Sequence, residues 1–116
     1  MLEEKKVQIS ARHLDKTTIF DVSGDIDLAT SPQLRKALLH ELRETRTPRV
    51  VLNLKAVRYM DSSGVASLVE GLKVSRGSGA RLILYGLNPS VREVLQLSKL
   101  VKIFEIYENE EQAISP

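Results

Sequence analysis

The stretch that decides the fold is residues 59–65, Tyr-Met-Asp-Ser-Ser-Gly-Val, where an apolar run ends and a helical pattern begins. Residues 50–57, just upstream, are rich in valine and leucine, which predicts a strand buried on both of its faces. Downstream, apolar residues recur at helical spacing, at Val65, Leu68, Val69 and Leu72. The sequence therefore predicts a strand, a tight turn and a helix that begins near Asp61.

The residue that caps this helix decides which serine hydroxyl is available. As N-cap, Asp61 would accept hydrogen bonds from the N–H groups of the first turn. Met60 and Val65 would then occupy the two positions of a hydrophobic staple, and Ser62 would be the first helical residue with its hydroxyl pointing to solvent. If Ser62 were the cap, its oxygen would be partly engaged and the staple would be lost. We favour Asp61.

The chain before this stretch predicts a hairpin and a first helix. Two runs of alternating apolar and polar residues, 6–12 and 18–22, flank the turn-forming residues 14–17, which indicates antiparallel strands. Ser31-Pro32 is expected to be the N-cap and first residue of a helix that runs to about Glu44. The helix that follows the Asp-Ser-Ser-Gly stretch is expected to end near residues 76–79, where glycines suit a C-cap.

The remaining predicted elements are, in order, a strand from Ala80 to Tyr85, a helix opened by Asn88-Pro89 and ending near residues 97–100, a short edge strand at residues 103–106, and a marginal helix from Asn109 to Ile114. The order β-β-α-β-α-β-α-β-α predicts an α/β fold. We expect a mixed sheet opened by an antiparallel hairpin, with later strands parallel and helices mainly on one side. Residues 1–116 are expected to form one domain, with its core at about residues 5–107.

The run Met-Asp-Ser-Ser-Gly-Val between an apolar strand and an amphipathic helix resembles the signature of STAS domains, in particular the bacterial anti-sigma-factor antagonists. In that family a partner kinase phosphorylates the serine directly after the aspartate. The resemblance assigns this role to Ser62, with Ser63 as the runner-up. It covers nearly the whole chain, from the hairpin through the helix opened by Asn88-Pro89, and it implies the same mixed sheet.

A second motif of the same family is a turn of the form Gly-acid-apolar-Asp, which matches residues 24–27 here. In the antagonists its aspartate belongs to the partner-binding surface near the phosphorylated serine. The resemblance therefore implies a partner-binding role for Asp27 and, second to it, for Asp25. We place Asp61, Ser63 and Gly64 in the same surface, because they flank Ser62 in the sequence.

Composition limits the function classes. Cysteine is absent, no apolar run approaches the ~20 residues of a membrane span, and residues 1–6 lack the apolar core of a signal peptide. We therefore expect a cytoplasmic location. The 17 basic and 15 acidic residues nearly balance, and the five aromatic residues do not alternate with the basic ones that crowd residues 35–58. We interpret this basic run as a solvated helix face and expect no nucleic-acid partner.

Three catalytic or ligand-binding alternatives fit the sequence poorly. A serine hydrolase needs G-x-S-x-G and a nearby histidine, but Met60 replaces the first glycine, and His13 and His40 are expected on other surfaces. A receiver domain would need a lysine where Asn88 stands, and the opening hairpin has the wrong topology. The glycines of residues 77–79 follow a helix instead of a strand, so they do not match a phosphate-binding loop. We expect no catalytic residues, no metal and no cofactor.

The resemblance implies a partner-switching function. The unphosphorylated protein would bind an anti-sigma factor that is also a GHKL-type serine kinase, which releases the sigma factor, and phosphorylation at Ser62 would abolish binding. The alternative is a STAS subunit of a transporter or signalling scaffold that contacts other proteins without phosphorylation. Nucleotide binding by the domain itself is a third possibility. We expect a monomer or weak dimer.

Overall fold

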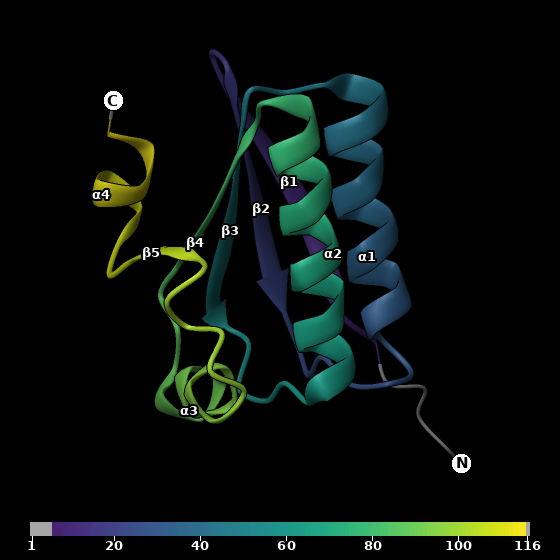
Figure 1. Ribbon diagram of the computed structural model, residues 1–116, viewed down its shortest axis with the longest axis vertical. Helices are drawn as coiled ribbons and strands as arrows, with labels where there is room; N and C mark the ends of the chain where they lie inside the picture. Colours follow the sequence, from purple (N-terminus) through teal and green to yellow (C-terminus); the bar gives the residue numbers. More distant parts are fainter. Residues whose placement is uncertain (1–5, 116) are drawn as a thin grey trace.

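A computed structural model describes residues 6–115, and Figure 1 shows its arrangement. Five strands form one sheet in chain order: β1 (Gln8–Leu14), β2 (Thr17–Ser23), β3 (Arg49–Ala56), β4 (Arg81–Tyr85) and β5 (Glu105–Tyr107). The helical elements are α1 (Ser31–His40), the π-helical turn η1 (Glu41–Thr45), α2 (Ser62–Ser78), α3 (Pro89–Leu97) and α4 (Glu110–Ile114). This is the predicted order of strands and helices.

The sheet is mixed, as the alternation of elements predicts. β1 and β2 form an antiparallel hairpin, and every later pair of neighbouring strands is parallel. Asp15 takes a positive φ of 49° in the hairpin turn, which is narrower than residues 14–17 because Leu14 and Thr17 pair with each other. Because β2 and β3 are parallel, the loops that leave them toward α1 and α2 lie at the same edge of the sheet.

Helices cover the two faces of the sheet unequally. Figure 1 shows α1 and α2 side by side against one face and the short α4 on the other. The larger core lies under α1 and α2 and includes Val50, Leu52 and Leu54 of β3. A smaller cluster lies under α4, where Val51 packs with four other buried residues, Ile19, Ile83, Tyr85 and Ala113. The prediction that β3 is buried on both faces is confirmed.

Two predicted boundaries around α1 are wrong. The N-cap position is Thr30, not Ser31, because Ser31 N and Thr30 N both donate to Asp27 O and so extend the preceding turn. The α-helix also ends at His40 instead of near Glu44. The chain continues as the π-helical turn because Arg46 N donates to Glu41 O, while the buried Glu41 carboxylate accepts from the hydroxyls of Thr18 and Thr47.

The short edge strand is also displaced from its predicted range. It begins at Glu105 instead of residue 103, because the chain after α3 first makes a turn in which Leu100 N donates to Leu95 O and Ile103 N to Leu100 O. Phe104 is buried in the larger core and ends this turn. The helix at the C-terminal end is confirmed, with Asn109 as a true N-cap that accepts from Gln112 N at 2.9 Å.

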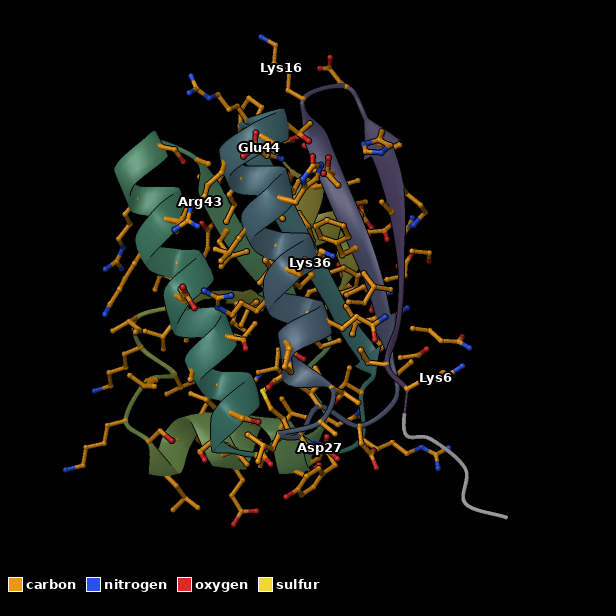
Figure 2. All side chains as sticks on the ribbon, turned by 90° about the vertical axis from the view of Figure 1, so that its right-hand side faces the viewer. Lys6, Lys16, Asp27, Lys36, Arg43 and Glu44 are labelled. Atoms are coloured by element: carbon orange, nitrogen blue, oxygen red, sulfur yellow. The ribbon has the colours of Figure 1, made fainter. Side chains whose placement is uncertain are left out.

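The basic residues of α1 and of the following turn η1 lie on the outer side of the helix layer, as expected for a solvated face. Lys36 and Arg43 are exposed, and Figure 2 shows both on the surface of the helix layer. Arg35 forms a bidentate ion pair with Glu70 of α2, at 2.5 and 2.8 Å. Within residues 6–115, no helix combines the length and apolar character that a membrane crossing requires.

Candidate functional site

The candidate site lies at the edge of the sheet where β2 and β3 end and α1 and α2 begin. An isolated parallel bridge joins Ile26 to Met60, in which Ile26 N donates to Tyr59 O at 2.9 Å and Asp61 N donates to Ile26 O at 3.0 Å. The bridge brings together the two motifs singled out in the sequence, the Gly-acid-apolar-Asp turn and the Asp-Ser-Ser-Gly stretch. Ile26 and Met60 are both buried in the larger core.

Asp61 caps α2, as predicted. Its backbone is extended, and its Oδ1 accepts from Ser63 N at 2.9 Å and from Ser63 Oγ at 2.5 Å. These hydrogen bonds, the one from the Ser63 hydroxyl above all, lower the pKa of the Asp61 carboxyl below its usual value, and the negative charge of Asp27 opposes the shift. Met60 and Val65 are both buried at the expected staple positions.

The two serines therefore differ in availability. Ser62 is the first residue of α2, its side chain is exposed, and its hydroxyl makes no hydrogen bond to any other residue in the described range. Ser63 is half-buried, and its hydroxyl donates a hydrogen bond to Asp61 Oδ1. Ser62 consequently presents the accessible alcohol of this pair, while Ser63 contributes to the cap.

Gly64 lies beneath this surface and not on it. It is buried, and a Cβ placed there would lie 2.6 Å from Met60 Cγ and 2.7 Å from Ile26 Cγ2, closer than real contacts allow. The prediction that Gly64 is itself a partner-contacting residue is therefore revised: its role is to let the first turn of α2 pack directly on the bridge. This close packing explains why a glycine follows the two serines.

Asp27 organises the turn that leads into α1. It is half-buried, and its Oδ1 accepts from Ala29 N at 3.0 Å, Thr30 N at 3.1 Å and Thr30 Oγ1 at 3.2 Å. Thr30 Oγ1 also donates to Asp25 O at 2.7 Å. Figure 2 shows Asp27 where α1 begins, at the opposite end from Glu44 of the following turn η1. The charge of Asp27 is thus held in a fixed place near Asp61, whereas the Asp25 side chain is exposed.

Two residues at the start of α3 bind the loop that leads into α2, and the sequence did not predict these contacts. Asn88 was expected only to open α3, but its Nδ2 donates to Val57 O at 2.6 Å and to Lys55 O at 3.1 Å. Ser90 Oγ donates to Arg58 O at 2.6 Å. Three carbonyl groups, one at the end of β3 and two in the loop before the cap of α2, are therefore bound by side chains from the start of α3. No local pattern indicates such contacts, because their partners lie more than 30 residues away.

The other polar candidates lie elsewhere. His13 is exposed near the hairpin turn, with its Nδ1 3.1 Å from Thr18 Oγ1, and His40 is exposed at the last residue of α1. Neither histidine is therefore placed to act on Ser62. Among residues 6–115, histidine, aspartate and glutamate side chains form no group of three that could hold a metal ion.

Known proteins share this fold and sequence pattern. The family model of the STAS domain matches residues 8–113. The anti-sigma F factor antagonist of Paenibacillus polymyxa is 31% identical over 109 residues, which cover 94% of this chain and 93% of that protein. The anti-sigma-B factor antagonist of Listeria monocytogenes is 33% identical over 101 residues, 86% of each chain. The crystal structure of an anti-sigma factor antagonist from Mycobacterium paratuberculosis superposes with a TM-score of 0.79 at 25% identity, covering 93% of this chain and 91% of that one.

Proposed function

Because this chain belongs to the STAS domain family, we propose that it is an anti-sigma factor antagonist that is switched off by phosphorylation of Ser62. In its unphosphorylated form it binds an anti-sigma factor that is also a GHKL-type serine kinase, and the bound anti-sigma factor releases its sigma factor. Antagonists of this family are regulatory binding proteins and not enzymes. The kinase supplies ATP and magnesium, and this chain is its ligand and its substrate.

The observation that carries the proposal is the exposed, unengaged hydroxyl of Ser62 at the first position of α2. A kinase needs an alcohol that can reach its γ-phosphate without unfolding the substrate. Ser62 meets this requirement, because it is fixed by the helix behind it and by the cap at Asp61. Ser63 meets it less well, since phosphorylation there would break the hydrogen bond of its hydroxyl with Asp61.

A phosphate on Ser62 should leave the domain folded. At the start of a helix it meets the positive end of the helix dipole, which favours a negative charge by about 0.3 to 2 kcal/mol. The carboxylates of Asp61 and Asp27 repel it by about 1 kcal/mol for each charge pair in a largely aqueous setting. These contributions nearly cancel, so the free energy of unfolding changes little.

The same phosphate should have a large effect on a complex. A partner that covers Ser62 must remove water from the new charge, which costs several kcal/mol unless a cation pairs with it. Asp61, next to the serine, and Asp27, which acts electrostatically on Asp61, already place negative charge on this side of the interface. A loss of about 3 kcal/mol weakens binding by more than a hundredfold, enough to separate the two proteins.

Substitutions at the two serines test this function. Purified anti-sigma factor kinases of the source organism would be titrated with the wild-type chain and with Ser62→Ala, Ser62→Asp and Ser63→Ala. Ser62→Ala should bind like wild type and lose phosphorylation, Ser62→Asp should bind more weakly, and Ser63→Ala should still be phosphorylated. If Ser62→Ala and Ser62→Asp both bind like wild type, Ser62 is outside the interface. Binding to a transporter ATPase in place of any kinase would support the scaffold alternative.

A further inference from the structure

Two large apolar side chains are exposed beside Ser62. Leu28, in the turn between β2 and α1, is 79% exposed, and Tyr59, in the loop between β3 and α2, is 50% exposed. The bridge between Ile26 and Met60 ties their two loops together, since Ile26 N donates to Tyr59 O itself. Leu28 and Tyr59 therefore belong to two loops that are joined directly, and Ser62 follows the bridge residue Met60 by two positions.

The backbone of the turn around Leu28 is fixed by hydrogen bonds, although the Leu28 side chain is exposed. The turn around it is closed by backbone N–H groups of Ala29 and Thr30 that donate to the Asp27 carboxylate, and by Ser31 N, which donates to Asp27 O at 2.7 Å. A residue that is fixed before binding loses little conformational freedom when it docks. An exposed leucine on a stiff turn is therefore suited to serve as an anchor in a partner's pocket.

We propose that Leu28 and Tyr59 are the apolar anchors through which the Ser62 surface docks on the anti-sigma factor kinase. This inference rests on the proposed function and assigns its binding affinity to particular side chains. The matching kinase surface is an apolar recess bordered by cationic groups, because the exposed Asp25 and the ionised Asp61 belong to the same two loops as the anchors. The anchors are continuous with the surface that the kinase must cover to reach Ser62.

The carboxylates and the apolar anchors contribute differently to binding, because they differ in how they are solvated. Exposed carboxylates at the rim of an interface contribute mainly to association rate and partner choice, and salt screens their effect. Buried leucine and tyrosine contribute affinity that salt does not screen, and aromatic residues are frequent among the residues that dominate binding. Because the anchors belong to the two loops that the bridge joins just before Ser62, a partner that docks on them also covers the serine, and a phosphate there would have to lose water in the complex.

The test compares matched alanine variants by titration calorimetry of the unphosphorylated chain against the purified anti-sigma factor kinase that binds wild type. Leu28→Ala and Tyr59→Ala should each weaken binding by about tenfold to fiftyfold. Leu97→Ala is the control, because Leu97 of α3 is 76% exposed and outside the two loops; it should bind within about twofold of wild type. Thermal unfolding should be unchanged in Leu28→Ala and Leu97→Ala, since each removes a largely exposed side chain, whereas Tyr59→Ala should stay folded with a slightly lower melting temperature because half of Tyr59 is buried.

Two further readouts separate anchoring from general damage. The weakening by Leu28→Ala should be the same at about 0.1 M and about 1 M salt, whereas the weakening by Asp25→Asn should shrink as salt rises. In the kinase reaction Leu28→Ala should raise KM and leave kcat unchanged, because the Ser62 hydroxyl is untouched.

The outcomes also separate a failure of the anchors from a failure of the proposed function. If wild type binds and Ser62→Asp weakens binding, but Leu28→Ala and Tyr59→Ala bind like Leu97→Ala, the anchors are refuted and the proposed function stands. If wild type binds no anti-sigma factor kinase, the proposed function fails and the inference fails with it. A large effect of Leu97→Ala alone would move the interface to α3 and would also refute the anchors.

Discussion

Replacing Gly64 with alanine tests whether the serine-bearing end of α2 is packed as tightly as the structure requires. The added methyl group would lie 2.6 Å from Met60 Cγ and 2.7 Å from Ile26 Cγ2, where ordinary contacts begin at 3.4 Å. Both neighbours belong to the bridge that joins the two loops of the site, and both are buried, so neither can move into solvent. Overpacking of this kind costs about 1 to 3 kcal/mol.

The same substitution also has a favourable effect that must be separated from the clash. Alanine is about 0.5 to 1 kcal/mol more favourable than glycine inside a helix. Gly77→Ala provides the matched control, because Gly77 lies in the same helix and a Cβ there would have nothing within 4 Å. The difference in unfolding free energy between the two variants therefore isolates the clash, at about 1 to 3 kcal/mol.

Urea unfolding followed by circular dichroism measures this difference. We expect Gly77→Ala to be as stable as wild type or slightly more stable, and Gly64→Ala to be less stable by about 1 kcal/mol, with a melting temperature lower by about 4 °C. Gly64→Ala should also expose the loop between β3 and α2 to faster amide exchange, because its bridge must shift. If the two variants unfold at the same urea concentration, the tight packing under Ser62 is refuted.

Three further predictions concern the supports of the site and the far side of the sheet. Asn88→Ala should lower the unfolding free energy by about 1 to 3 kcal/mol, because two carbonyl groups lose their hydrogen-bond donor. Amide exchange in the loop before α2 should become faster, and unchanged exchange would contradict the supporting role of Asn88. Hydrogen bonds from Arg12 lower the pKa of Asp21 and Glu110 below their ordinary values near 4. The two ion pairs therefore stabilise the folded state above about pH 4, and this stabilisation is lost on acidification. The unfolding free energy of Arg12→Gln, measured with urea, should fall less on acidification than that of wild type, and an equal fall would refute the link. Burial, followed by the hydrogen bond to Glu110, raises the pKa of Tyr85 to about 12, and the hydrogen bond with Glu105 also raises the pKa of Tyr107. Ultraviolet titration should therefore show two late-ionising tyrosines in wild type and one in Tyr85→Phe, and two in that variant would contradict the assignment.

The elements that the sequence predicts well are those whose causes are local. The hairpin, the doubly buried β3 and the cap at Asp61 follow from alternation, from a run of β-branched residues, and from an acid placed one residue before the helical pattern. Gly79 likewise ends α2 with a positive φ of 75°, as its position after the helix indicates. Each of these signals lies within about one turn of the residue that it explains.

The features that the sequence misses depend on distant partners. The π-helical turn after α1 arises because Glu41 is held by Thr18 from the neighbouring hairpin, 23 residues away. The contacts of Asn88 with the loop after β3 are equally remote. Leu28 gave no signal of its own, since an apolar residue in a turn can be buried or exposed, and only the folded turn shows that it points outward.

The most direct test of the account is the affinity of the Ser62-phosphorylated chain for its anti-sigma factor kinase. The chain would be phosphorylated to completion, the modified serine identified by mass spectrometry, and binding measured by titration calorimetry beside the unmodified chain, with thermal unfolding of both forms recorded. We expect binding to weaken by more than a hundredfold while the melting temperature changes by no more than a few degrees. Equal affinity of the two forms, or unfolding of the modified chain, would contradict the claim that a charge on Ser62 changes the docking surface and leaves the fold intact.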